Sequence, residues 1–136
     1  MSKPVLGIIG GGQLGSMLAN AAKKINIKTV IFCDDPEAPA QNFCDEFIYG
    51  KYDNQNSIDQ FINSVDIITF EFENIPYETL EKINSFKTVL PHPSINKIVQ
   101  NRLSEKDFVN KLNIRTTQYT SINNEKNIFS NENLIP

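Results

Sequence analysis

A glycine-rich turn, Gly10–Gly15, contains the residues of this chain best suited to bind a ligand. It reads Gly-Gly-Gly-Gln-Leu-Gly, follows the apolar run Val5–Ile9 and opens into an alanine-rich helical segment. In such a G-x-G-x-x-G turn the first glycine permits a tight turn, the second allows a ligand to approach the backbone, and the third allows close helix packing. Free N–H groups at the helix start favour an anion, most often a phosphate. The turn therefore predicts a phosphorylated small-molecule ligand, with packing alone as the alternative; its candidate contacts are Gly11, Gly12, Gln13 and Leu14.

A candidate ribose-binding acid, Asp34, follows the second apolar run of the chain. A NAD-binding domain places its ribose-binding acid about 20 residues after the glycine turn, which is close to the position of Asp34. The sequence Asp34-Asp35-Pro36 is equally typical of a turn in which an aspartate bonds to the backbone. NAD binding and a plain turn both stay open at this position.

A pair of acids, Glu71 and Glu73, comes directly after the apolar run Asp66–Phe70. If the strand continued through them, both carboxylates would point to the same side of the sheet. Acids that face a cleft suit the hydroxyls or amines of a sugar or amino-imidazole better than a bare phosphate. Solvation at a strand end is the alternative.

Composition excludes several classes of partner. The 136 residues have a net charge of −3 and show no basic patch, which argues against nucleic acid. No apolar run approaches the roughly 20 residues that a membrane-spanning helix needs. The N-terminus lacks the apolar core of a signal peptide, so we expect a cytoplasmic protein with no membrane partner.

Cysteine and histidine chemistry is also limited. Cys33 and Cys44 do not form a C-x-x-C pair, and we expect free thiols rather than a disulfide. His92 is the only histidine and stands between two prolines, which is typical of a rigid turn. A structural zinc site is therefore not expected, and no metal ligand is predicted in this segment.

Strand and helix signals alternate along the first 95 residues. Strands are expected at 5–9, 28–33, 45–49, 66–70 and 88–90, and helices are expected to start with a Ser57 cap, at Pro76 and with a Ser94 cap. Near-continuous apolar runs suit a parallel sheet covered on both faces. The predicted fold class is therefore α/β, with a Rossmann-like, open, doubly wound parallel sheet. Ligands bind at the carboxyl ends of such strands, so the glycine turn, Asp34 and residues 71–74 should share one edge.

The segment after residue 95 differs in character. Ser104–Asp107 has the pattern of a capping box that opens a helix, and Ile114–Thr117 has a strand-like pattern. Residues 125–136 are rich in asparagine and poor in large apolar side chains.

Four blocks of this sequence resemble one family of ATP-grasp ligases, the N5-carboxyaminoimidazole ribonucleotide synthetases, and occur in that family's order. They are Gly10–Leu18, Asp35–Ala40, Thr69–Pro76 and Asn101–Lys106. The resemblance implies a Rossmann-like pre-ATP-grasp domain over residues 1–95. It implies a linker helix and the start of a truncated ATP-grasp domain over residues 96–136. Related ATP-grasp enzymes share the glycine block, whereas the Thr-Phe-Glu-Phe-Glu-Asn block is more specific.

In that family ATP phosphorylates bicarbonate, and the carboxyl group passes to the amine of 5-aminoimidazole ribonucleotide during de novo purine synthesis. The resemblance implies ribonucleotide contacts at Gln13, Leu14, Glu71 and Glu73, and an ATP contact at Arg102. It implies ATP and Mg²⁺ as cofactors, bound mainly outside this segment, and a homodimer. No catalytic residue is expected within the segment, which should not hydrolyse ATP alone.

One departure and three alternatives accompany this resemblance. Family members commonly have arginine where this chain has Ser16, which removes a cation near the turn. From position alone, Arg102 could equally be an exposed charge at a helix start. A formate-dependent glycinamide ribonucleotide transformylase would share the architecture, and a non-catalytic nucleotide-binding module would share the turn.

Overall fold

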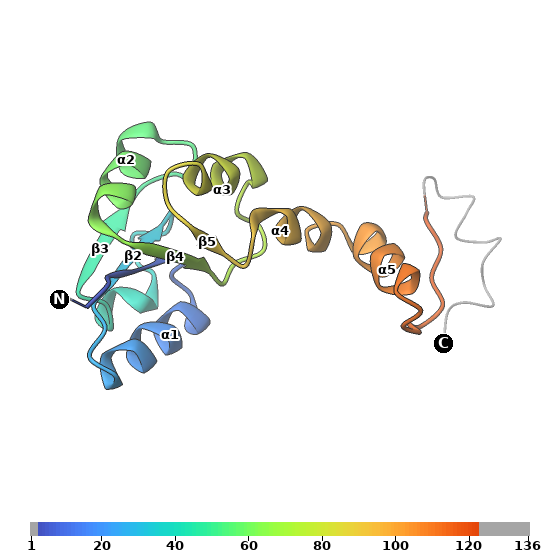
Figure 1. Cartoon of the computed structure of the whole chain (residues 1–136), viewed down its shortest axis with the longest axis horizontal. Coiled ribbons are helices and arrows are strands. Elements are labelled where there is room, and N and C mark those ends of the chain that lie inside the picture. The colour runs from blue at the N-terminus through green and yellow to red at the C-terminus, as the bar shows by residue number, and fades with distance from the viewer. Residues whose placement is uncertain (1–2, 123–136) are drawn as a thin grey trace. The chain divides into compact units, whose positions relative to one another are not determined.

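The computed structural model describes residues 3–122 and divides into two compact units, Met1–Lys97 and Ile98–Pro136. The first unit contains a sheet of five strands (Figure 1). The strands are β1 (Leu6–Ile9), β2 (Thr29–Cys33), β3 (Glu46–Tyr49), β4 (Ile67–Phe70) and β5 (Val89–Leu90). All neighbouring strands are parallel, in the order β3-β2-β1-β4-β5. The predicted α/β class and open parallel sheet are confirmed, and each strand is slightly shorter than expected.

The connections between strands cover both faces of this sheet. They are α1 (Gln13–Lys24), the short 3-10 helix η1 (Pro39–Asn42), α2 (Gln55–Ser64) and α3 (Tyr77–Asn84), and α4 (Pro93–Val99) follows β5. Figure 1 shows α1 on one side of the sheet and α2 and α3 on the other. Since consecutive residues of a strand face opposite sides, a sheet covered on both faces requires apolar residues at nearly every position. The strand β2, all five residues of which are buried, meets this requirement.

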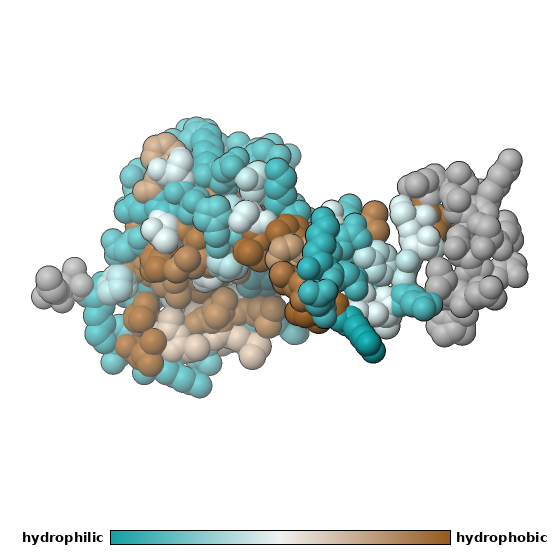
Figure 2. Space-filling model, turned by 45° about the vertical axis from the view of Figure 1, so that its right-hand side comes forward, coloured by the Kyte–Doolittle hydropathy of each residue, from teal (hydrophilic) through white to brown (hydrophobic). Residues whose placement is uncertain are grey.

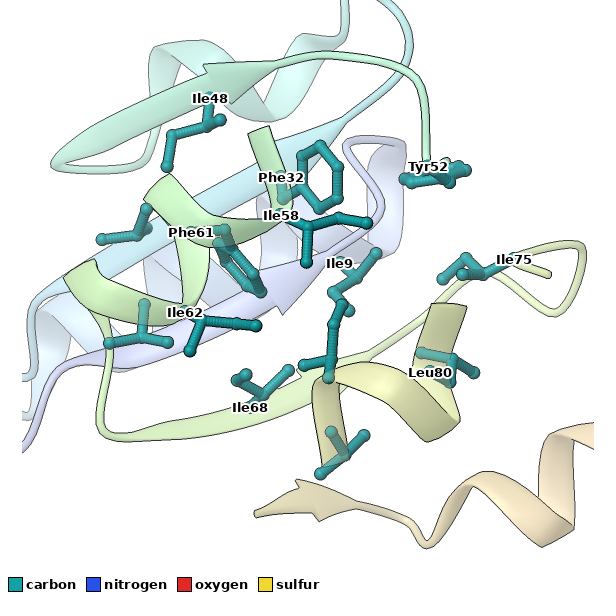
Figure 3. Packing of buried hydrophobic residues seen from close by; sticks show 14 residues of the cluster. Ile9, Phe32, Ile48, Tyr52, Ile58, Phe61, Ile62, Ile68, Ile75 and Leu80 are labelled. Atoms are coloured by element: carbon teal, nitrogen blue, oxygen red, sulfur yellow. The ribbon is translucent and has the colours of Figure 1, made fainter. Parts of the chain in front are cut away.

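The larger of the two hydrophobic clusters lies between the sheet and the helices α2 and α3 (Figure 3). At its centre the ring of Phe32 contacts the ring of Phe61, with centroids 5.5 Å apart, and the ring of Tyr52 edge-on at 5.4 Å. Leu80 and Ile83 of α3 are fully buried. The smaller cluster, on the α1 side, includes Ile8, Ala19, Ile31, Cys33, Ala38 and Ala40.

The helix α1 buries only small residues and exposes large ones. Gly15, Ala19 and Ala22 face the sheet, which allows the helix to approach closely. Leu14 and Met17 are more than half exposed. Figure 2 shows apolar surface, in brown, among the polar surface of the molecule. Within the described residues no helix is both long and apolar enough to cross a membrane.

The expected start of α2 at Ser57 is wrong. The helix begins at Gln55, and its cap is Asn54, whose Oδ1 accepts a hydrogen bond from the Ser57 backbone N–H at 3.0 Å. Asparagine and serine are both good caps, so propensity alone does not choose between them. The α3 helix begins at Tyr77, directly after the expected Pro76.

Two later helix starts also differ from the prediction. The α4 helix already includes Ser94, and Nδ1 of His92 accepts a hydrogen bond from the Ser94 backbone N–H at 3.2 Å. The helix α5 (Arg102–Lys111) is capped by Asn101, which accepts from the N–H groups of Leu103 and Ser104, both at 3.0 Å. The predicted capping box at Ser104 is therefore wrong, because an asparagine upstream already satisfies the free N–H groups.

The strand expected at Ile114–Thr117 does not form. Side chains of this stretch contact α5 instead: Asn110 Nδ2 donates to Thr116 Oγ1 at 3.0 Å, and Lys106 Nζ donates to Thr117 Oγ1 at 2.8 Å. A strand needs a neighbouring strand to complete its backbone hydrogen bonds, and none is present among residues 98–122. The asparagine-rich stretch 125–136 lies outside the described residues.

Candidate functional site

A pocket of about 260 Å³ lies at the carboxyl ends of β1, β2 and β4. The glycine turn, the end of β2 and the end of β4 all contribute to its lining, through Gly10, Gly11, Gly12, Cys33, Asp34, Asp35, Ala38, Pro39, Tyr52, Glu71 and Phe72. The sequence predicts that the turn, Asp34 and residues 71–74 share one edge of the sheet. The pocket confirms this for the turn, Asp34 and Glu71.

Two glycines of the turn, Gly10 and Gly15, each have a structural reason of their own. Gly10 has φ +109°, a backbone conformation that side chains other than glycine rarely adopt. A Cβ on Gly15 would lie 2.6 Å from the Gly10 carbonyl oxygen, so the third glycine allows the helix to pack against the turn. Gly12 is the residue directly before α1, and Gln13 and Leu14 form the start of the helix as expected.

The group that approaches Gly12 is the carboxylate of Glu71. The Gly12 N–H donates to Glu71 Oε1 at 3.2 Å. The backbone of Glu71 is fixed by its own N–H, which donates to the Ile9 carbonyl at 3.2 Å. This bond joins the residue after β4 to Ile9, the last residue of β1, which directly precedes the glycine turn.

The two aspartates that follow β2, Asp34 and Asp35, differ in their hydrogen bonding. Asp35 Oδ1 accepts a hydrogen bond from the Glu37 N–H at 2.9 Å, so the backbone-bonding turn predicted from this sequence is made by Asp35. Asp34 lines the pocket beside the glycine turn. Of the described residues that line the pocket, none is a lysine or an arginine, and three of them, Asp34, Asp35 and Glu71, have carboxylate side chains.

Tyr52 and Cys33 are pocket residues that the sequence analysis missed. The Tyr52 hydroxyl lies 4.0 Å from Cys33 Sγ. Burial raises the pKa of Tyr52, and the neighbouring Cys33 and Asp34 raise it further, so its hydroxyl stays protonated and can donate. Tyr52 shortly follows the end of β3, and position beyond a strand end is the signal that could have identified it. Cys33 and Cys44 are free thiols, as expected, Cys33 buried and Cys44 half-buried.

The remaining predicted contacts lie outside this pocket lining. Gln13 and Leu14 are exposed at the start of α1, and Glu73 is exposed. The strand β4 ends at Phe70, so the condition under which Glu71 and Glu73 would point to one side is not met. Arg102 begins α5 and pairs with Glu105, with 2.6 Å between Nη1 and Oε2. It also lines a second pocket with Asn101, Leu103, Lys106 and residues 119–122.

Ser16, which stands where the resembling family commonly has arginine, bonds within α1. Its hydroxyl donates to the Gly12 carbonyl at 3.0 Å. Within residues 3–122 no three His, Cys, Asp or Glu side chains are grouped so that they could hold a metal ion.

A parallel sheet in this order, with a glycine-rich turn and a pocket at the carboxyl end of its first strand, defines a Rossmann-like ligand-binding domain. The family model of the ribonucleotide synthetase preATP-grasp domain matches residues 2–100. This chain belongs to that family.

Curated relatives agree with this assignment. The chain is 38% identical over 117 residues to the bifunctional purine synthesis protein purC/E of Dictyostelium discoideum, covering 86% of this chain and 12% of that protein. It is 35% identical over 125 residues to the N5-carboxyaminoimidazole ribonucleotide synthase of Brucella melitensis, covering 92% of this chain and 34% of that protein. The chain thus spans about a third of the length of the Brucella relative.

Solved structures show the same similarity. The N5-carboxyaminoimidazole synthetase of Staphylococcus aureus complexed with ADP is 31% identical, with a TM-score of 0.86 over 93% of this chain and 34% of that one. The synthase of Aspergillus clavatus, in complex with ADP and 5-aminoimidazole ribonucleotide, is 26% identical. Its TM-score is 0.75 over 85% of this chain and 31% of that chain.

Proposed function

We propose that this chain supplies the ribonucleotide-binding domain of an N5-carboxyaminoimidazole ribonucleotide synthetase. The whole enzyme would carboxylate 5-aminoimidazole ribonucleotide with bicarbonate and ATP in purine biosynthesis. The observation that carries this proposal is the acidic pocket at the glycine turn of a domain from the ribonucleotide synthetase family. It is supported by the names of the relatives and by the ligands of the solved structures.

The proposed ligand contacts come from residues that line the pocket and from their neighbours in sequence. Carboxylates accept hydrogen bonds from ribose hydroxyls and from an amine, so Glu71 and Glu73 are proposed to meet the sugar and amino-imidazole. The first N–H groups of a helix have no partner within it, so those of Gln13 and Leu14 are available to the ligand's acceptors. Gly11 and Gly12 line the pocket and are proposed to contact the ligand through their backbone.

ATP is proposed to contact Arg102, whose guanidinium suits phosphate oxygens. The pairing with Glu105 would then be exchanged for the nucleotide. The described residues offer no metal site, so Mg²⁺ and most ATP contacts are assigned to the two-thirds of the synthetase length that this chain does not span. The homodimer, the cytoplasmic location and the domain limits at residues 95 and 96 stay predictions.

The test is a chimera in which this chain replaces the matching third of the Brucella synthetase. We expect ADP release that requires both bicarbonate and 5-aminoimidazole ribonucleotide, and no such release from the 136-residue chain alone. Glu73→Gln should raise the KM for the ribonucleotide roughly tenfold, because a charged hydrogen-bond partner is lost. Arg102→Ala should raise the KM for ATP.

Matched controls are Glu78→Gln and Arg115→Ala, since both residues are exposed and lie outside both pockets. They should leave both KM values unchanged. An unchanged KM in Glu73→Gln, or ATP turnover by the chain alone, would contradict the proposal. Formate-dependent rather than bicarbonate-dependent turnover would indicate the transformylase alternative, and NAD binding without turnover a non-catalytic module.

A further inference from the structure

The start of α1 is already occupied by a negative group of the protein itself. Glu71 Oε1 accepts the Gly12 N–H at 3.2 Å. The same oxygen would lie 2.8 Å from a Cβ on Gly10, 3.3 Å from one on Gly12 and 3.6 Å from one on Gly15. One carboxylate oxygen thus stands over all three glycines of the G-x-G-x-x-G pattern.

This is the position in which a dinucleotide-binding domain holds a pyrophosphate. In such domains the glycines let the phosphate approach the backbone, and the helix start supplies N–H groups and a positive dipole. Here the glycines let a side chain approach. The helix start and the Gly12 N–H stabilise the Glu71 carboxylate in the way they would stabilise a phosphate oxygen.

The surroundings make a second anion at this position unfavourable. Asp34 and Asp35 line the same pocket, and none of its described lining residues is a lysine or an arginine. The Glu71 backbone is held by its hydrogen bond to Ile9, so the carboxylate is attached to a fixed part of the sheet. A phosphate would have to displace Glu71 and then lie beside two further carboxylates.

We propose that Glu71 is a specificity-determining residue that occupies the phosphate position of the glycine turn. The site then rejects pyrophosphate there and takes its ligand through hydroxyl and amino groups. This proposal deepens the proposed function and rests on it for the identity of the natural ligand. The sequence left NAD binding and a plain turn open at Asp34. With Glu71 at the phosphate position, the proposal excludes NAD, although the glycine turn and Asp34 are arranged as in an NAD site.

The probe for the test is ADP-ribose, which carries the pyrophosphate and riboses of NAD. It is titrated into the 136-residue chain while the backbone amide signals of Gly12 and Gln13 are followed by NMR. The variants are Glu71→Ala, which empties the position, and Glu71→Gln, which removes the charge but retains an oxygen that can accept from Gly12. Glu78→Ala removes one negative charge from an exposed site in α3 and serves as the control.

We expect Glu71→Ala to bind ADP-ribose at least about tenfold more tightly than the unaltered chain, with shifts at Gly12 and Gln13. Glu71→Gln should gain less, and Glu78→Ala should gain nothing. Equal affinity in the unaltered chain and Glu71→Ala would overturn the proposal, as would an equal gain in Glu78→Ala. If Glu71→Ala does not fold, Glu71→Gln decides in the same way: a gain supports the proposal and no gain overturns it.

A parallel titration with 5-aminoimidazole ribonucleotide separates this proposal from the proposed function. Failure of the unaltered chain to bind the ribonucleotide would count against the proposed function alone. The gain of ADP-ribose binding in the Glu71 variants is measured independently of that result.

Discussion

The sheet-containing unit, Met1–Lys97, and the following segment 98–122 obtain their helices in different ways. In the first unit α2 and α3 each bury three residues against the sheet. In the segment, α5 is as long as α2 but has no buried residue. It is held by local bonds instead, such as the Asn101 cap and the Tyr119 hydroxyl, which donates to Asp107 at 2.6 Å.

The difference shows which interactions stabilise each part. Helices of about ten residues are marginal by themselves in water, and most helices in proteins depend on the packing of an apolar face. The helix α2 has such a face in Ile58, Phe61 and Ile62, whereas the apolar residues of α5 reach the solvent. Loss of one large side chain should therefore have very different effects in the two regions.

The largest expected effect comes from Phe61→Ala. Phe61 is fully buried and contacts the ring of Phe32, so its truncation should lower the free energy of unfolding by about 3–5 kcal/mol. The matched variant Phe108→Ala, in α5, should change it by no more than about 0.5 kcal/mol, because Phe108 is 42% exposed. Urea unfolding followed by circular dichroism measures both. Similar losses in the two variants would show that α5 also depends on a packed core.

A smaller effect is expected from the two asparagine caps. Asn54→Ala and Asn101→Ala each remove a side-chain acceptor from the first turn of a helix, at a local cost of about 1 kcal/mol. In α2 this cost should appear in the global unfolding of the sheet unit, because the helix and sheet form one core. In α5 it should appear as faster amide hydrogen exchange over 102–111 with an unchanged global transition.

The outcome that contradicts this contrast is a shift of the global transition by Asn101→Ala equal to that by Asn54→Ala. The two stretches would then unfold as one cooperative unit. Lys111→Ala, at an exposed position of α5 that is not a cap, controls for a substitution in this helix.

The smallest expected effect is a dependence of stability on alkaline pH. Burial raises the pKa of Tyr52 in the folded protein above its ordinary value of 10.0. Because its pKa is raised, the folded state holds the Tyr52 proton more tightly than the unfolded state does. The contribution of this proton to the free energy of unfolding is therefore complete below about pH 10 and is lost as the pH rises further. Tyr52→Phe should therefore flatten the decline of unfolding free energy between about pH 9 and 11.

Tyr119→Phe provides the comparison in the other region. Its pKa is also raised, because of the hydrogen bond to Asp107, but its hydroxyl is not buried. Removal of its hydroxyl should leave the alkaline decline of the sheet unit unchanged. Equal flattening by both variants would show that burial of Tyr52 is not the cause.

Much of the fold could be predicted because its signals are local. Each strand lies in a short run of mostly apolar residues, and a parallel sheet that is covered on both faces requires such runs. The helix starts were less predictable, since Asn54 and Asn101 replaced the expected Ser57 and Ser104 as caps. Cap residues have similar propensities, so the choice depends on where tertiary packing or the turn before the helix lets the first turn begin.

The candidate site was partly predictable for the same reason. The glycine turn and Asp34 follow strand ends, and topology alone brings strand ends together. Tyr52 was missed because it joins the pocket through a loop after β3 rather than through a motif.

The sequence by itself determined that this chain forms a parallel α/β sheet with a glycine-rich turn at the end of its first strand. Apolar runs, turn glycines and their spacing are properties of neighbouring residues, and they act locally. Only the tertiary structure decided which group stands at that turn. Glu71 is 59 residues from Gly12, and it reaches the Gly12 N–H because parallel pairing of β1 with β4 sets the ends of both strands side by side.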